Sequence, residues 1–140
     1  MENMENMEKT VKSRTQIKSE RNENKREMRP HAKARYIRIS PSKVRIVLDV
    51  VRRKPVVEAL AMLEAIPNAS AEVTYKLIKS AVANAEFKGL SRSDLYVAEI
   101  FADGGPILKR MNPVSKGRAH RINKRTSHIT VILDTIKEGN

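Results

Sequence analysis

The chain has 140 residues, which is enough for one domain with an extension and too short for two ordinary domains. Its 28 Lys and Arg residues outnumber 16 Asp and Glu residues, and the formal net charge of +12 predicts a polyanionic partner. The absence of cysteine excludes disulfide frameworks and thiolate zinc sites. No apolar run approaches the roughly 20 residues needed to cross a bilayer, so we expect no membrane span.

Residues 1–31 open with the repeat MENMENMEK and carry eight basic and six acidic residues without sustained apolar periodicity. This composition is typical of a disordered, low-complexity extension. Its six Glu residues and the lack of a basic leader followed by an apolar run argue against a secretory or organelle-targeting signal, so we expect a cytoplasmic protein. We expect residues 32–136 to form a single domain, with residues 137–140 as a tail.

The first structured elements are expected after residue 33. Residues 34–39 (ARYIRI) predict a short strand or extended segment. Ser40 and Pro41 then fit the N-cap and first position of a helix, which ends near Pro55. Apolar residues follow at helical spacing: Val44, Val47, Leu48 and Val51. Such a helix buries one side and can offer its basic side to phosphates.

Two more helices are expected in the near-neutral middle of the chain. The first begins at Val56 and ends near Ile66. The second begins after Asn68 or Ser70, carries an apolar stripe over about four turns, and ends at Gly89.

From Leu95 the apolar period changes to two, and it does so again over residues 128–133, which predicts two strands. In the first, Tyr96, Ala98 and Ile100 are expected on one face, and Val97, Glu99 and Phe101 on the other. Together with the helices, these strands predict an α+β fold in which three helices pack on a small antiparallel sheet.

The segment between these strands is rich in Gly and Pro and has seven Lys and Arg residues between Lys109 and Arg125. An unstructured loop of that length is uncommon in a compact domain. We therefore predict a long protruding β-hairpin arm over residues 102–127, with Phe101 opposite His128 and the turn inside NPVSKG, between Val114 and Ser115. At roughly 3.3 Å per residue, twelve residues in each strand give an arm of about 40 Å. A hinge or bulge is expected at residues 104–106 (GGP), where the arm leaves the body.

The positive charge gathers in two blocks, residues 32–54 with a net +7 and residues 103–140 with a net +5. A charge run is often only a solvated surface, but two such blocks repel themselves unless a partner neutralises them. Since the arm has no aromatic residue, we expect contacts to RNA phosphates more than base stacking. The candidate RNA-binding residues are Lys33, Arg35, Arg38, Lys43, Arg45, Arg52, Arg53, Lys54, Lys109, Arg110, Lys116, Arg118, Arg121, Lys124 and Arg125.

Catalysis finds little support in the sequence. The three histidines, His31, His120 and His128, have no carboxylate at helical spacing, and no nucleophile or phosphate-loop motif is present. We therefore expect no enzyme, no metal and no cofactor. One alternative to RNA binding is an architectural DNA-binding arm, for which Val114 is the single candidate for an apolar wedge at the tip.

Five stretches carry a resemblance to a known family: SPSKVRIVLDVVRRK at 40–54, KLIKSAVANAE at 76–86, GPILKR at 105–110, KGRA at 116–119 and KRTSHITVIL at 124–133. They resemble the large-subunit ribosomal protein family numbered twenty-two. The resemblance implies a structural constituent of the large subunit that binds its ribosomal RNA, supports subunit assembly and lines the nascent-peptide exit tunnel with the hairpin tip. The tunnel-lining residues that it implies are Lys109, Arg110, Met111, Lys116, Gly117 and Arg118.

The partners implied are large-subunit ribosomal RNA, neighbouring ribosomal proteins, the nascent peptide and macrolide antibiotics. At three arm positions the chain departs from the residues usual in the family. Gly104 replaces an acidic residue, Val114 an arginine and His120 an aspartate. No tip-specific response to drugs or stalling peptides is therefore carried over.

Overall fold

The computed structural model describes residue 13 and residues 29–136. Most of the expected disordered extension and the expected tail lie outside these residues. The elements are β1 (His31–Ile37), α2 (Pro41–Val51), α3 (Val56–Ala65), α4 (Ala69–Phe87), the short 3-10 helix η1 (Arg92–Asp94), β2 (Leu95–Gly104), β3 (Leu108–Pro113), β4 (Ala119–Lys124) and β5 (Ser127–Thr135). The predicted α+β fold is confirmed, and no helix in the described part of the chain is long and apolar enough to span a membrane.

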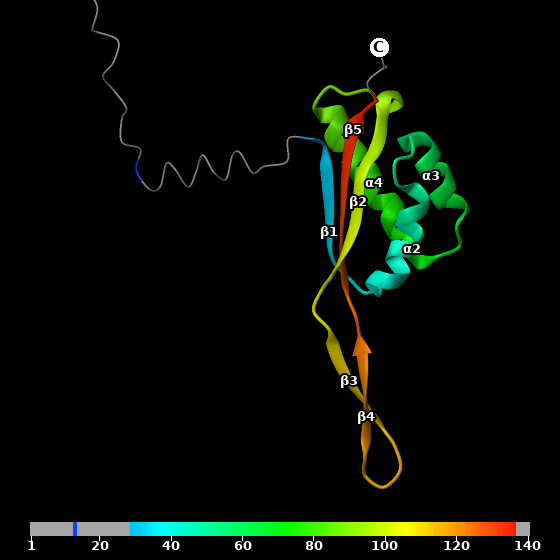
Figure 1. Cartoon of the computed structure of the whole chain (residues 1–140), viewed down its shortest axis with the longest axis vertical. Coiled ribbons are helices and arrows are strands. Elements are labelled where there is room, and N and C mark those ends of the chain that lie inside the picture. Colours follow the sequence, from blue (N-terminus) through cyan, green and yellow to red (C-terminus); the bar gives the residue numbers. More distant parts are fainter. Residues whose placement is uncertain (1–12, 14–28, 137–140) are drawn as a thin grey trace, which may run out of the picture.

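The body is an antiparallel sheet in the order β1-β5-β2, with β5 in the centre. Helix α4 contacts β1 and β5, α2 and α3 contact β2, and α2 also reaches β5 (Figure 1). In the last strand, Ile129, Val131 and Leu133 are fully buried in the same core as the helices, as predicted, but Thr130 and Ile132 between them are also buried, so burial does not alternate along β5. Beyond the sheet, β3 and β4 pair only with each other and project away from the helices (Figure 1).

The three helices begin where the sequence predicts, but α2 ends at Val51, four residues before Pro55, and the Ser40 side chain forms no capping hydrogen bond. Helix α2 starts at Pro41 and buries all four residues of the predicted stripe. The Ser40 carbonyl accepts hydrogen bonds from the N–H groups of Lys43 and Val44, at 3.1 and 3.2 Å. At the end of α4, Gly89 adopts φ +80°, and the N–H groups of Gly89 and Leu90 donate to carbonyls in the last turn. This is the pairing by which a left-handed glycine ends a helix.

The first strand begins earlier than predicted, at His31 rather than at residue 34. Its pairing with β5 starts at His31 opposite Ile132, and the Pro30 carbonyl accepts a 2.8 Å hydrogen bond from the N–H of Leu133. The end of the strand is irregular, because the register shifts between Ala34 and Ile37. The alternation seen in residues 34–39 therefore does not mark one regular strand.

Strict alternation along the strand after residue 95 is wrong. Val97 lies opposite Leu133 and Glu99 lies opposite Ile132, so Ala98 is an extra residue in β2. Such a bulge shifts the side-chain alternation by one position. The buried positions are accordingly Leu95, Val97, Ile100 and Ala102.

Candidate nucleic-acid interface

The arm joins the sheet at a narrow, tightly fitted root. The N–H of Gly105 donates a 2.9 Å hydrogen bond to the Thr126 carbonyl, and the Thr126 hydroxyl donates a 2.7 Å bond to the Pro106 carbonyl. A Cβ atom at residue 105 would lie 2.4 Å from Thr126 Oγ1, so any residue larger than glycine would force the Thr126 side chain to move. The strands are interrupted at this point, between β2 and β3 on one side and between β4 and β5 on the other. The Gly-Gly-Pro segment therefore breaks the ladder where the arm leaves the body.

Within the arm, the register of β3 and β4 keeps like charges apart. Every Lys or Arg of the two strands faces an uncharged residue on the other strand, in the pairs Leu108 with Lys124, Lys109 with Asn123, Arg110 with Ile122, and Met111 with Arg121. Like charges directly opposite each other destabilise a strand pair. Since successive side chains alternate between faces, both faces of the ribbon carry cations.

The turn of the arm lies in NPVSKG as predicted, but the pairing of Pro113 with Ala119 centres it on Lys116 and not between Val114 and Ser115. Phe101 lies opposite Thr130, and His128 lies opposite Asp103, so the expected pairing of Phe101 with His128 is wrong by two residues. The chain reverses between Val114 and Arg118, and the N–H of Val114 donates a 2.9 Å bond to the Arg118 carbonyl. Two consecutive left-handed residues form this reversal, Lys116 and Gly117, with φ +59° and +69°.

The arm is a cationic surface without internal neutralisation. All seven of its Lys and Arg side chains are exposed, and no Asp or Glu occurs between Asp103 and Asp134. Ion pairs in the described part of the chain involve other residues. Arg110 Nη1 donates a 2.9 Å hydrogen bond to the Lys109 carbonyl of its own strand, which leaves its charge uncompensated. Among residue 13 and residues 29–136, no carboxylate neutralises the arm, so its charge is left for a partner.

The first basic block is divided between packing and surface. Arg45 donates from Nε and Nη2 to the Ala102 carbonyl, at 3.2 and 2.9 Å, and so ties α2 to β2. Arg52 pairs with Asp49 at 2.8 Å, and Lys54 pairs with Glu58 at 2.9 Å. The other predicted cations of this block are exposed and form no ion pair with a described residue; they are Lys33, Arg35, Arg38, Lys43 and Arg53. Three of the eight candidates thus already have a structural role.

The two basic blocks meet at the root of the arm. A cleft of about 510 Å³ lies between the segment before α2 and the end of β4. Its lining residues are Arg38, Ser40, Asn123, Lys124 and Arg125. Three cations without a carboxylate make this cleft suitable for an anion.

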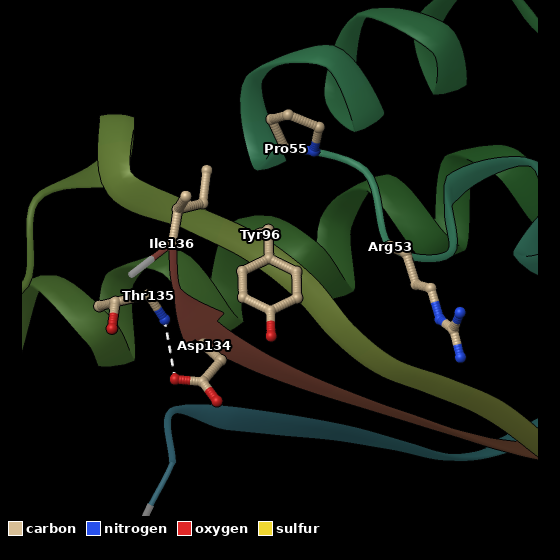
Figure 2. A pocket seen from close by; sticks show the side chains of 6 residues that line it. All are labelled: Arg53, Pro55, Tyr96, Asp134, Thr135 and Ile136. Carbon is tan, nitrogen blue, oxygen red and sulfur yellow. Dashed lines mark hydrogen bonds between the residues drawn. The ribbon is translucent and has the colours of Figure 1, made fainter. Parts of the chain in front are cut away.

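A second pocket, of about 590 Å³, lies at the end of the sheet far from the arm and does not resemble a catalytic site (Figure 2). Figure 2 shows its polar groups, in which the N–H of Thr135 donates a 2.8 Å bond to the carboxylate of Asp134. This pocket has one carboxylate and one cation, Arg53, but no nucleophile beside a base. Residue 13 and residues 29–136 also contain no group of three His, Asp or Glu side chains placed to hold a metal.

The histidines have separate local contacts. His31 Nδ1 lies 3.1 Å from the Arg29 carbonyl, and His128 Nδ1 accepts a 3.0 Å hydrogen bond from the N–H of Tyr36. His120 is exposed in β4, opposite Asn112. On the outer surface of α4, the pKa of Glu72 is lowered by a hydrogen bond from Lys76 and by its charge. That is an ion pair between two exposed side chains.

Sequence reasoning missed several residues that shape the arm root. Thr126 fixes Gly105, whereas Ser40 and Asn123 complete the cleft lined by the cations. Ser40 and Thr126 lie in the stretches at 40–54 and 124–133 that carry the family resemblance, but their roles at the root arise from contacts between distant segments, which the sequence pattern does not show. Tyr36 could have been found from the sequence, because an aromatic residue among basic residues is a common feature of RNA-binding surfaces.

Known proteins are similar in sequence to this chain over most of its length. The family described as ribosomal protein L22p/L17e matches residues 32–134. A protein of Caldicellulosiruptor saccharolyticus named large ribosomal subunit protein uL22 is 50% identical over 128 residues, which cover 91% of this chain and 97% of the relative. The protein of that name from Acetivibrio thermocellus is 55% identical over 100 residues, covering 71% and 80% of the two chains. The one from Agathobacter rectalis is 49% identical over 125 residues, covering 86% and 95%.

Proposed function

The chain belongs to the ribosomal protein L22p/L17e family, and from this premise we propose that it binds large-subunit ribosomal RNA through both basic blocks and lines the nascent-peptide exit tunnel with the tip of its arm. Membership makes the chain a structural constituent of the large subunit of the cytoplasmic ribosome, and not an enzyme. The RNA contacts, the position in the tunnel and a role in subunit assembly are the proposal.

The observation that carries the proposal is the unneutralised arm. Seven exposed cations lie on a two-stranded ribbon, and no carboxylate occurs in the chain between Asp103 and Asp134. A two-stranded ribbon is only marginally stable in water, so a partner that surrounds it also stabilises it. RNA phosphates supply the opposite charge, and their contacts release counterions. The arginines can hold phosphates through two parallel hydrogen bonds.

The RNA-binding residues that we propose are the exposed cations of both blocks. In the first block, Lys33, Arg35, Arg38, Lys43 and Arg53 are free of ion pairs with described residues, whereas Arg45, Arg52 and Lys54 would bind RNA through the donors that their present contacts leave over. In the arm they are Lys109, Arg110, Lys116, Arg118, Arg121, Lys124 and Arg125. Since these cations lie on both faces of the ribbon, we expect RNA on both sides of it.

The proposed tunnel-lining surface is the distal part of the arm. It comprises Lys109, Arg110, Met111, Lys116, Gly117 and Arg118, all of which are exposed. The arm projects from the body beyond every helix (Figure 1), a shape suited to reaching into a subunit interior. At this site the nascent peptide and macrolide antibiotics would be contacts of the tip, and neighbouring ribosomal proteins would contact the body.

The geometry gives the architectural DNA alternative no support. An intercalating wedge requires a protruding apolar side chain at the tip. Val114 is only partly exposed, and its N–H is bound to the Arg118 carbonyl within the turn.

The salt dependence of RNA binding tests the proposal. We compare the full chain with an arm variant in which Lys109, Arg110, Arg121 and Lys124 are replaced by Gln. A matched control replaces the four cations of residues 55–102, which are Lys76, Lys79, Lys88 and Arg92. Both variants lose the same charge, so a difference between them reports position.

The arm variant should lower the slope of log K against log salt by about 4, roughly one unit for each phosphate that is no longer bound, and the control should leave it nearly unchanged. Equal decreases would mean that only net charge attracts RNA, which contradicts a specific arm. In lysates, the chain should sediment with large subunits at moderate salt, and finding it mainly elsewhere would contradict the ribosomal site.

A further inference from the structure

An exposed tyrosine with an unusual backbone conformation lies near the cleft at the root of the arm. Tyr36 has φ +58°, in the left-handed region that bulky residues avoid. Its N–H donates to His128 Nδ1 at 3.0 Å, and the two rings meet edge to face with centroids 4.8 Å apart and an interplanar angle of 89°. Despite these contacts, Tyr36 is 63% exposed. Tyr36 therefore combines a left-handed backbone conformation with a largely exposed position beside His128.

Strained backbone of this kind concentrates at ligand sites, where the surrounding structure maintains it. Here the constraint comes from β5, which supplies His128 at the base of the arm. Exposed aromatic faces in a basic environment are platforms on which unpaired bases stack.

The cleft at the root of the arm lies close to Tyr36. Arg38 is two residues after Tyr36, so their Cα atoms are separated by at most about 7 Å. Across the cleft, Lys124 and Arg125 add two further cations from the end of the arm. Ser40, the N-cap of the eleven-residue helix α2, also lines the cleft, and the first turn of that helix has no acidic residue. The partial positive charge of the helix end therefore adds to the cationic side chains.

We propose that this site binds one unpaired nucleotide of the RNA. Its phosphate lies in the cleft against Arg38, Lys124 and Arg125, and its base stacks on the exposed face of Tyr36. A nucleotide fits both observations, since it carries an anion and a planar ring in one unit. A base inside a duplex does not fit, because its two faces are covered by its neighbours. This inference rests on the proposed RNA binding and adds a stacking contact that the aromatic-free arm does not supply.

The test uses the full chain and two RNA probes, a single-stranded octaribonucleotide and a blunt-ended duplex of eight base pairs without a loop. Tyr36→Asn removes the ring but keeps a residue type that readily adopts the left-handed conformation. Tyr36→Phe keeps the ring. Arg92→Ala removes an exposed cation from η1, next to the end of β2 that is farthest from the arm. Circular dichroism checks that each variant retains the fold.

Tyr36→Asn should weaken single-strand binding by about fivefold or more and leave duplex binding unchanged. Tyr36→Phe and Arg92→Ala should bind the single strand as the parent does, and Arg38→Ala should weaken binding of both probes. A base analogue whose fluorescence is quenched by stacking, placed in the octamer, should be quenched by the parent and not by Tyr36→Asn.

Single-strand binding that Tyr36→Asn leaves unchanged, or that falls equally with duplex binding, would overturn the nucleotide site while leaving RNA binding by the arm intact. Failure of the parent chain to bind either probe would overturn both proposals. The two failures are therefore distinguishable.

Discussion

Substitution of Gly105 tests whether the arm root is as tightly fitted as the contacts indicate. In Gly105→Ala the new Cβ atom would lie 2.4 Å from Thr126 Oγ1 and 3.2 Å from His128 Nε2. The Thr126 side chain cannot swing into solvent easily, because Thr126 is 3% exposed and its hydroxyl is bonded to Pro106. Accommodation therefore costs the hydrogen bond, about 1 kcal/mol, together with about 1–2 kcal/mol of overpacking. We expect the free energy of unfolding to fall by about 2–3 kcal/mol.

Gly104→Ala is the matched control. A Cβ atom at residue 104 meets nothing within 4 Å, and its φ lies outside the left-handed region. The control should change the free energy of unfolding by about 0.5 kcal/mol or less, or raise it slightly by restricting the unfolded chain. Gly104 pairs with Ser127 at the end of the sheet, and Gly105 follows directly. Strain at either glycine therefore lowers the free energy of unfolding of the sheet.

A double variant tests whether the contact between the new Cβ atom and Thr126 Oγ1 causes the loss of stability. Thr126→Ala alone should cost about 1 kcal/mol because its hydrogen bond is removed. Gly105→Ala combined with Thr126→Ala should cost little more than that, because the oxygen atom that meets the new methyl group is gone. Urea unfolding followed by far-ultraviolet circular dichroism measures the parent and all four variants. Additive losses of stability, or a Gly105→Ala protein as stable as Gly104→Ala, would refute the proposed fit of the root.

Three further predictions concern the body. Leu48→Ala should lower the free energy of unfolding by about 2–5 kcal/mol, since Leu48 is fully buried. Ile46→Ala on the same helix should have a small effect, because Ile46 is 67% exposed. Thermal unfolding compares the two variants, and equal destabilisation would contradict the orientation of α2. Ser127→Ala should leave the free energy of unfolding unchanged or raise it by up to about 1 kcal/mol, because the buried Ser127 hydroxyl has no hydrogen-bond partner among the described residues. A clear decrease in stability in urea unfolding would show that the hydroxyl is bonded. Lys76→Met should return the pKa of Glu72 upward to its ordinary value, as followed by an NMR pH titration. Because the folded-state pKa of Glu72 is lowered, the stabilisation by this pair is present above the ordinary pKa of 4.5 and disappears as the pH falls through the folded-state pKa; an unchanged titration in Lys76→Met would contradict the assigned cause.

The helices could be predicted from the sequence because their signals are local. Ser40 and Pro41 mark the start of α2, Gly89 ends α4, and the apolar stripe between residues 44 and 51 matches the buried face. Each signal depends on contacts within a few positions of the chain. The charge of the arm could also be predicted from the sequence, because it is a property of composition.

Pairing geometry was harder to predict. The bulge at Ala98 and the two-residue difference in hairpin register arise from how β2 meets β5, which alternation within one strand does not determine. The left-handed Tyr36 depends on His128, 92 positions away. The structural role of Arg45 likewise depends on a carbonyl in a distant strand. Long-range contacts of this kind leave no periodic signal in a single sequence.

A reconstruction of the assembled large subunit that contains this chain tests the central claim most directly. The proposed function predicts that β3 and β4 are enclosed by ribosomal RNA, with phosphates against the arm cations and residues 109–118 at the wall of the exit tunnel. An arm that lies in solvent, or packs only against protein, would contradict it.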